Sequence, residues 1–391
     1  MENYRSLRHL IVPLTGLNVV TGPNGSGKSS LYRALRLLAD GARNGVVAAL
    51  AREGGLPATL WAGPETIGRA VRDGTHPVQG TARSKPVALR LGFGAEDYGY
   101  AIDLGLPSVD MKLPPHLRTA FGLDPEIKRE TIWTGAQLRP SAVLCDRLGG
   151  FVKIRGDDGD WLQPVPIRPY DSMLSEIADP ERAPEVLGLR DRIRSWRFYD
   201  HFRTDAQAPA RRSQIGTRTL VLSHDGADLA AALQTVNEMG DAAGLEVAVE
   251  EAFPGSQLGI DKRENGVLAV QLRQHGLLRP LGAEELSDGT LRYLLMAAAL
   301  LSPRPASLLV LNEPETSLHA DLLPALAGLI VRAAAHTQVV VVSHARLLIE
   351  AISALEDEVE LTTVELAKEF GETVVAGREP LDGPPWTWPK R

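Results

Sequence analysis

The stretch GPNGSGKSS, residues 22–30, decides the fold. It fits the pattern G-x-x-x-x-G-K-[ST], in which glycines let backbone N–H groups turn inward around phosphate oxygens. The run LNVV (17–20) before it predicts a strand, and KSSLYRALRLLADGAR (28–43) has the apolar spacing of a helix that stops near a glycine. A strand, this loop and then a helix N-terminus with its positive potential form the context expected of a phosphate-binding loop.

Each position of this loop is a candidate contact to ATP. Lys28 is long enough to reach the β- and γ-phosphates, so we predict a catalytic role for its charge as well as a binding role. The Ser29 hydroxyl is placed to coordinate Mg²⁺. The alternative is a glycine-rich turn that binds nothing, and the flanking strand and helix disfavour it. The predicted nucleotide contacts are Gly22, Pro23, Asn24, Gly25, Ser26, Gly27, Lys28, Ser29 and Ser30.

Two apolar runs late in the chain predict strands that end in polar residues. SLLVLNE (307–313) and TQVVVVSH (337–344) suit strands that are buried under helices in a parallel sheet. The segment ADLLPALAGLIVRAAA (320–335) between them predicts the crossover helix. Ligands of such sheets bind beyond the carboxyl ends of the strands, so we expect the polar residues there to be functional.

These polar residues have the chemistry of a hydrolytic site. Glu313 is a candidate general base that positions an attacking water. Asn312 stands on the Mg²⁺ side with a carbonyl oxygen but no charge, and His344 can hydrogen-bond a γ-phosphate. Two alternatives for His344 are a structural histidine at a strand end and a metal site shared with His319.

A third segment, ELSDGTLRYLL (285–295), opens a predicted helix. Ser287 can cap a helix that starts near Thr290, and Gly289 permits a close approach to the end of that helix. By itself this pattern predicts an ordinary N-cap.

Composition limits the classes of function. The chain has 391 residues, enough for one large domain or two, and its 44% hydrophobic and 23% charged residues indicate a globular protein. A formal net charge of -7 argues against nucleic-acid binding over a broad surface, though not at a local basic patch. Cys145 is the only cysteine, and we expect a small buried hydrophobe in a reducing, cytoplasmic setting. No leader pattern or membrane-spanning run is recognised.

The motifs occur in the order phosphate loop, SDG segment, NEPETSLH (312–319) and VVVVSH (339–344). In this order they resemble the ABC-type ATPase heads of the SMC/RecF/OLD branch, and in particular the bacterial predicted ATPases of the AAA type with EPE..LH motifs. The likeness covers residues 1–40 and 280–350. The segment SWRFYDHFRTDAQAPARR (195–212) also resembles one group of these ATPases.

The resemblance implies an α/β fold, namely a P-loop NTPase of the ABC-type head class with a mixed sheet. We expect a nucleotide-binding core lobe over 1–106 and 303–391, and an inserted helical or irregular lobe over 107–302 that ends in the signature helix. The implied activity is ATP hydrolysis with ATP and Mg²⁺ by a homodimer that closes around two ATP molecules. Ser287, Asp288 and Gly289 of one subunit would then contact the γ-phosphate bound by the other.

Many relatives act in DNA repair or phage defence, so DNA or an effector protein is the expected partner, without membrane insertion. Three features depart from the pattern. The signature reads Ser-Asp-Gly where Ser-Gly-Gly is common, and Asn312 replaces the usual aspartate, which predicts slow hydrolysis. The Mg²⁺-sensing glutamine is not placed, with Gln79 and Gln137 as candidates. Two other functions stay open, an ATP-dependent scaffold without hydrolysis and the ATP-binding subunit of a transporter.

A basic stretch at 190–212 interleaves arginines with aromatic residues. Such a pattern can bind phosphate backbones and stack on bases. It is also typical of a packed segment whose arginines pair with Asp191, Asp200 and Asp205, and an arginine here could reach the ATP site. The residues are Arg190, Arg192, Arg194, Trp196, Arg197, Phe198, Tyr199, Phe202, Arg203, Arg211 and Arg212.

Overall fold

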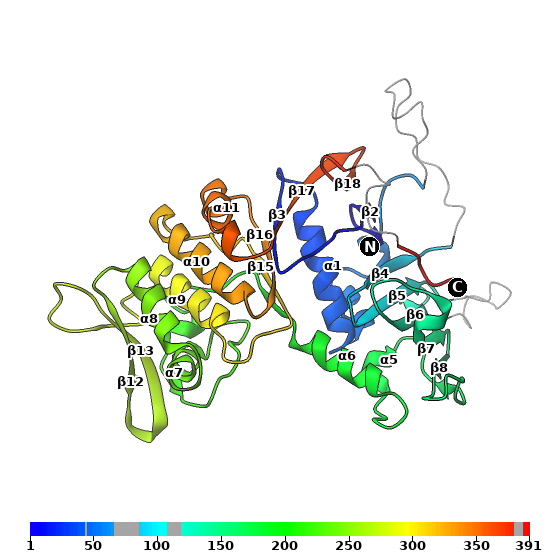
Figure 1. The fold of residues 1–391 in the computed structure, drawn as a ribbon, viewed down its shortest axis with the longest axis horizontal. Helices are drawn as coiled ribbons and strands as arrows, with labels where there is room; N and C mark the ends of the chain where they lie inside the picture. The colour runs from blue at the N-terminus through cyan, green and yellow to red at the C-terminus, as the bar shows by residue number, and fades with distance from the viewer. Residues whose placement is uncertain (44, 66–85, 108–118, 379–385) are drawn as a thin grey trace. The chain divides into compact units, whose positions relative to one another are not determined.

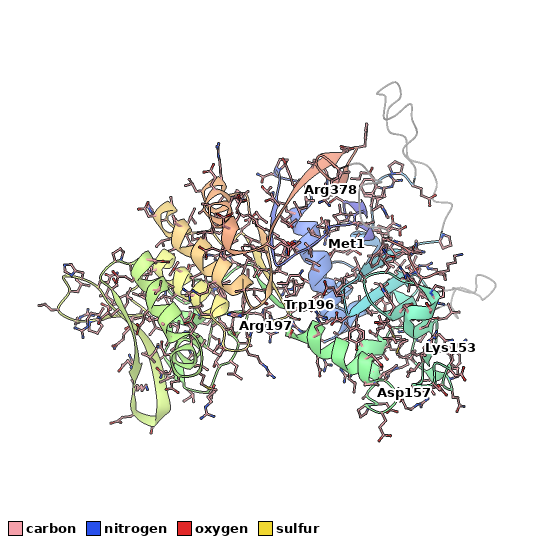
Figure 2. The ribbon with its side chains drawn as sticks, viewed as in Figure 1. Met1, Lys153, Asp157, Trp196, Arg197 and Arg378 are labelled. Carbon is pink, nitrogen blue, oxygen red and sulfur yellow. The ribbon has the colours of Figure 1, made fainter. Side chains whose placement is uncertain are left out.

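The computed structural model describes residues 1–43, 45–65, 86–107, 119–378 and 386–391. The chain divides into two compact units (Figure 1). Unit 1 comprises residues 1–13, 22–195 and 365–391, and unit 2 comprises residues 14–21 and 196–364. Trp196 and Arg197, labelled in Figure 2, are the first residues of unit 2 after the long segment of unit 1.

Unit 1 contains an antiparallel sheet in the order β2-β1-β4-β5-β6-β7-β8-β9. Strands β4 and β5 form an antiparallel hairpin, with Leu91 of β4 opposite Ile102 of β5. Figure 1 shows β4, β5, β6, β7 and β8 side by side. The strands are β1 Glu2–Tyr4, β2 Leu7–His9, β4 Leu89–Phe93, β5 Tyr98–Gly105, β6 Glu126–Thr134, β7 Val143–Leu148, β8 Phe151–Ile154 and β9 Val165–Pro166.

The expectation that the lobe over 107–302 is helical or irregular is wrong for the strands between residues 126 and 166, and residues 108–118 of that lobe lie outside the described residues. Strands β6 to β9 extend the sheet that the hairpin begins, because β6 pairs with β5 and the following strands pair in turn. Cys145 on β7 is buried as expected. Burial raises the pKa of its thiol to about 12, which keeps the group protonated and unreactive.

The helices of unit 1 include the one predicted after the phosphate loop. It is α1, Lys28–Gly41, and it buries Leu31, Leu35 and Leu38 on one face. A β-hairpin late in the chain pairs Leu366 with Val375. The other elements are α2 Val46–Arg52, α3 Leu56–Thr59, α5 Met173–Glu176, α6 Pro184–Ser195, β18 Glu372–Val375 and β17 Leu361–Glu369, whose residues up to Val364 belong to unit 2.

Unit 2 is built on four parallel strands in the order β10-β15-β16-β3. The three strands predicted at 17–20, 307–313 and 337–344 are confirmed, and their interiors are buried. The bounds are β10 Arg197–Tyr199, β15 Leu308–Asn312, β16 Gln338–Val342 and β3 Leu17–Thr21. In the register of the sheet, Val342 pairs with both Asn312 and Val20, so the three strands end at one edge.

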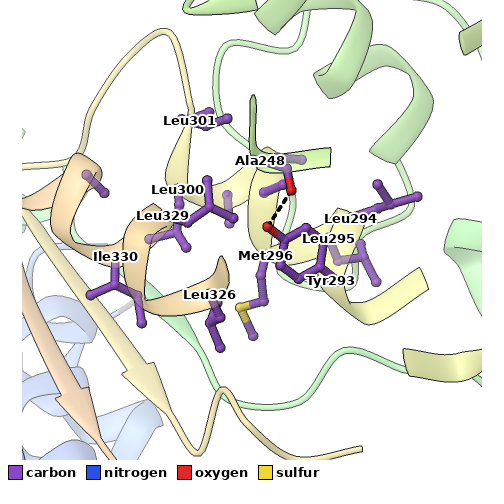
Figure 3. Close-up of a cluster of buried hydrophobic side chains, with 14 of the residues drawn as sticks. Ala248, Tyr293, Leu294, Leu295, Met296, Leu300, Leu301, Leu326, Leu329 and Ile330 are labelled. Atoms are coloured by element: carbon purple, nitrogen blue, oxygen red, sulfur yellow. Dashed lines mark hydrogen bonds between the residues drawn. The ribbon is translucent and has the colours of Figure 1, made fainter. Parts of the chain in front are cut away.

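Helices α9 and α10 form the core of unit 2 together with α8 (Figure 3). Leu326 and Leu329 of α10 lie beside Met296 of α9, and the Tyr293 hydroxyl donates a 2.8 Å hydrogen bond to the Ala248 carbonyl. The helix predicted to open in the segment 285–295 and the crossover helix predicted at 320–335 are confirmed. The helix bounds are α7 Leu229–Met239, α8 Ala242–Ala252, α9 Asp288–Leu300 and α10 Leu323–Ala334, and α11 spans Arg346–Ser353.

A smaller antiparallel sheet completes unit 2. Its strands are β11 Gln214–Ile215, β12 Gln257–Lys262, β13 Val267–Arg273 and β14 Leu281–Gly282. Short 3₁₀ turns connect several elements of both units: η2 Pro140–Ala142, η3 Pro209–Arg211, η4 Glu264–Gly266, η5 Ala320–Leu322 and η6 Glu356–Glu358.

The two compact units have other boundaries than the lobes expected from the sequence. Residues 107–195 fall in unit 1 because their strands continue its sheet, and 196–302 fall in unit 2 with β15 and β16. Within the described ranges, no helix is both long and apolar enough to cross a membrane.

Candidate functional site

The phosphate loop of unit 1 adopts a backbone that only glycine allows at two positions. Gly22 has a φ of 141° and Gly27 a φ of 111°. A Cβ atom on Gly22 would overlap the Leu366 carbonyl, and one on Gly27 would overlap the Thr373 side chain. The glycines of the motif therefore let this loop close against the β17–β18 hairpin.

Lys28 is the first residue of α1, and its side chain points back into the loop. It is only 7% exposed, and its ammonium donates to the carbonyls of Gly22 at 2.6 Å and Pro23 at 3.2 Å. Ser29 is exposed at the N-terminus of the helix. The Ser26 hydroxyl is buried and has no hydrogen-bond partner among the described residues. A cation, an unsatisfied hydroxyl and a helix N-terminus in one loop fit a phosphate group.

Thr373 holds the loop from the other side, and no motif in the sequence indicates this contact. Its hydroxyl donates to the Ser26 carbonyl at 2.8 Å and lies 2.8 Å from the Ser6 hydroxyl. The two partners of this contact lie 347 positions apart in the chain, so no local pattern could have predicted it.

In unit 2, Glu313 follows directly after β15 in a strained conformation. Its φ is 49°, which is rare for a residue with a side chain, and its N–H donates to the Val342 carbonyl at 2.7 Å. Its carboxylate is 43% exposed, and one oxygen lies 3.5 Å from the Nδ1 atom of His344. The structure thus brings Glu313 and His344 together, with the carboxylate open to water, as a general base requires.

Glu315, unlike Glu313, has a buried carboxylate. Its side chain is 8% exposed, and its Oε1 accepts a 2.7 Å hydrogen bond from the Ser343 hydroxyl. The same oxygen accepts from the N–H groups of His344 and Ala345, both at 3.3 Å. Glu315 therefore fixes the backbone around His344, and its second oxygen is buried without a hydrogen-bond partner in the described part of the chain.

A buried arginine of α9 was also missed. Arg292 is 1% exposed and donates to the Glu313 carbonyl at 3.3 Å and to the Phe202 carbonyl at 3.4 Å. Burial lowers the pKa of its guanidinium, and the nearby carboxylates of Glu315 and Asp200 act in the opposite direction. The available signal was a single arginine inside the otherwise apolar run TLRYLLMAAALL (290–301).

The SDG segment caps α9 as predicted, although the helix begins at Asp288. The Ser287 side chain accepts from the Thr290 N–H at 3.1 Å. At Gly289, a Cβ atom would come within 3.2 Å of the Ser317 carbonyl, so a small residue is needed there. The N-cap interpretation is confirmed, and it leaves any role in nucleotide binding as a prediction.

The aromatic residues of the basic stretch belong to the interior. Trp196, Phe198, Tyr199 and Phe202 are each 6% exposed or less, and Tyr199 donates to the Leu222 carbonyl at 2.8 Å. Side chains in this state cannot stack on bases. The packed-segment interpretation is therefore the one that fits, and one of the expected acidic partners, Asp205, forms a salt bridge with Arg203.

Of the remaining candidates, His319 and Gln137 lie within the described residues. Among the residues that the structure describes, no three His, Cys, Asp or Glu side chains gather as a metal site would require. His319 is exposed and contacts Asp321. Gln137 is exposed in unit 1 and accepts from Arg139, and Gln79 lies outside the described residues.

The predicted residues therefore form two groups. The phosphate loop lies in unit 1, and it starts at Gly22, one residue after β3 of unit 2 ends at Thr21. Asn312, Glu313 and His344 lie in unit 2 at the ends of β15 and β16, beside the end of β3, because the Ser343 N–H donates to the Val20 carbonyl at 3.1 Å.

Comparison with known proteins gives one family match and several structural likenesses. A family model described as "AAA domain, putative AbiEii toxin, Type IV TA system" matches residues 17–350. Among solved structures, an Smc head bound to the C-winged helix domain of ScpA has 12% identity and a TM-score of 0.46, with 93% of this chain and 91% of that chain covered. The SMC head domain from Thermotoga maritima has 13% identity and a TM-score of 0.44, with 97% of each covered. The search of curated proteins finds no match.

Proposed function

Because this chain belongs to the AAA-domain family whose model matches residues 17–350, we propose that it is an ATP-binding and ATP-hydrolysing switch that dimerises around two ATP molecules. The observation that carries the proposal is the pairing of Glu313 and His344 at the edge where β3 also ends, since β3 leads directly into the phosphate loop. In P-loop ATPases a charged loop and a water-positioning carboxylate act on the same phosphate.

In the proposed reaction Lys28 and the loop N–H groups hold the β- and γ-phosphates. Glu313 orients a water and accepts its proton as the water oxygen bonds to the γ-phosphorus, while the bond to the β–γ bridging oxygen breaks and ADP leaves. His344 donates to the γ-phosphate, and Glu315 holds His344 in place through the backbone. Ser29 and Asn312 would hold Mg²⁺, which neutralises phosphate charge when bound.

The homodimer is tested by mixing two inactive variants. If Ser287, Asp288 and Gly289 of one chain serve the loop of its partner, Lys28→Ala and Ser287→Arg chains should each be inactive alone. A mixture should recover up to one working site in each heterodimer, measured as ATP turnover. Light scattering should show a dimer only with ATP. Should the mixture stay inactive and the protein remain monomeric at saturating ATP, the shared-site model is wrong.

Asn312 predicts a weak hold on Mg²⁺. A carboxylate there would add a charge pair worth about 4 kcal/mol at close range and an effective dielectric near 20, but ATP and Ser29 share the ion and reduce the net gain. We expect Asn312→Asp to lower the Mg²⁺ concentration for half-maximal ATP turnover by roughly tenfold, a net 1.4 kcal/mol. A Mg²⁺ titration of both forms measures it. If the aspartate form shows no shift and the wild type hydrolyses nothing, a non-hydrolysing scaffold is the better proposal.

We place this switch in the cytoplasm, in DNA repair or phage defence. The family description names a putative toxin of a toxin–antitoxin system, which supports the defence role. ATP turnover measured with and without DNA, followed by partner capture with the ATP-bound form, separates a DNA-stimulated switch from a scaffold. It also separates both from a transporter subunit, whose partner would be a membrane protein.

A further inference from the structure

We propose that Arg211 is a positioning residue that fixes the SDG segment in the conformation needed to contact ATP. This inference rests on the proposed dimer, in which that segment completes the partner's site. It also assigns a role to an arginine of the basic stretch, whose aromatic residues belong to the packed core.

The guanidinium of Arg211 binds both ends of the segment that leads into α9. Its Nη1 donates to the carbonyls of Ala283 at 2.9 Å and Leu286 at 2.7 Å, and its Nη2 donates to the Asp288 carboxylate at 2.6 Å. One side chain thus contacts residues before and after Ser287. The Arg211 side chain is 8% exposed, so little water competes for these hydrogen bonds.

The other donors of the same group reach the segment that carries it. Nε and the second N–H of Nη2 donate to the Thr204 carbonyl at 2.9 and 2.7 Å, so each of the five N–H bonds has an acceptor. A lysine ammonium has three donors on one atom and cannot span these acceptors, since only the planar fork of arginine reaches in several directions at once.

The segment from Phe202 to Arg211 is anchored at both ends. It leaves β10 beside β15, and the Phe202 carbonyl accepts from Arg292 of α9. Arg203 and Asp205 form a bidentate pair at 2.9 Å, and Arg211 ends the turn η3. The segment is therefore tied to α9 at its start through Arg292 and at its end through Arg211, so its geometry is imposed on the SDG segment.

A second arginine also contacts the segment that leads into α9, at the protein surface. Arg279 donates two 2.7 Å hydrogen bonds to Glu285, which holds the pKa of that carboxyl at about 2. This pair is exposed, and such pairs contribute little to stability. Arg211 is the buried contact and is the one expected to set the conformation.

Arg211→Ala should leave ATP binding intact and impair the dimer. Ser287 still caps α9 without Arg211, so the helix persists, but the Ala283 and Leu286 carbonyls lose their donor and Asp288 loses its counter-charge. We expect an ATP affinity within about twofold of wild type by calorimetry, and a turnover lower by roughly 100-fold, as misplacement of a reacting group causes. Arg212→Ala is the matched control, because Arg212 is the exposed neighbour and should behave as wild type.

Mixing experiments assign the defect to one half of the site. Arg211→Ala mixed with Lys28→Ala should recover one working site, because the intact loop of one chain meets the intact SDG segment of the other. Mixed with Ser287→Arg it should recover none, because both chains then lack a working SDG segment. A structural defect of the whole chain would not distinguish the two mixtures.

The outcomes distinguish a failure of the Arg211 inference from a failure of the proposed function. If wild type turns over ATP as a dimer and Arg211→Ala does the same, or if Arg211→Ala is rescued by Ser287→Arg, the inference is wrong and the proposed function stands. If wild type neither binds ATP nor dimerises, the proposed function itself has failed. Should Arg211→Ala unfold, Arg211→Lys decides, with about a tenfold loss of turnover expected and wild-type turnover contradicting the role.

Discussion

Glu313→Gln is expected to bind ATP with the affinity of the wild type and to hydrolyse it about 10²- to 10⁴-fold more slowly. The amide has nearly the shape of the carboxylate, so the ground state is preserved, but it cannot accept the proton of the attacking water. The loss should therefore fall on kcat and not on ATP binding. The variant should accumulate as an ATP-bound dimer, seen by scattering and by single-turnover measurement of ADP.

The control for this experiment is Glu356→Gln, an exposed glutamate in η6 that should turn over normally. Near-normal turnover of Glu313→Gln would place the base elsewhere, and Glu315 is the nearest other carboxylate to His344. The contacts of Glu315 argue for a different role, since its Oε1 already accepts three hydrogen bonds from residues 343–345. Glu315→Gln is thus expected to disturb the position of His344.

Lys28→Ala is expected to lose tight ATP binding. A unit charge pair at 4 Å is worth about 4 kcal/mol at an effective dielectric of 20, which corresponds to roughly 10³-fold in the dissociation constant. The present contacts of Lys28 are two loop carbonyls, which are easily exchanged for phosphate oxygens. Calorimetry with ATP measures the change, and thermal unfolding without ATP checks that the fold survives.

Lys153→Ala is the matched control, since Lys153 is an exposed lysine of the same unit, labelled in Figure 2. Its ATP affinity should equal that of the wild type. An unchanged affinity in Lys28→Ala would refute the assignment of residues 22–30 as the phosphate loop, whatever the later steps of the reaction show.

The elements around the phosphate loop could be predicted because each has a local pattern. The glycines and Lys28 identify the loop, and apolar β-branched runs identify β15 and β16. The family match over residues 17–350 confirms the P-loop ATPase fold to which these patterns point. Local pattern was sufficient for these elements, because the candidate site residues come immediately after buried strands.

The strands of residues 126–154 were not predictable in this way, and the reason is a buried ion pair. Glu130 and Arg147 face each other at 3.3 Å with no exposed side-chain area, and the Tyr100 hydroxyl also donates to Glu130 at 2.7 Å. Charged residues are usually exposed to solvent, so a sequence segment that contains them is easily mistaken for a loop when it is a buried strand. Only the partner strand shows that the charge is neutralised.

The same holds for the residues that support the candidate site. Thr373 and Arg211 contact the phosphate loop and the SDG segment from far along the chain, and no periodicity connects them. The buried aromatic residues at 196–202 show the opposite problem. Their interleaving with arginine suggested an exposed surface for bases, whereas all four are buried, two of them on the short strand β10.

The place of β3 limits how this protein can be divided. It supplies one strand of the sheet of unit 2, and the buried Asn18 side-chain amide donates a 3.0 Å hydrogen bond to the Val339 carbonyl. A fragment that starts at Trp196 would hold most of unit 2 yet lack this strand, which leaves β16 with an open edge of unpaired backbone groups that favours aggregation. Residues 14–21 are thus required to complete unit 2, although more than 170 positions separate them from the rest of that unit in the sequence.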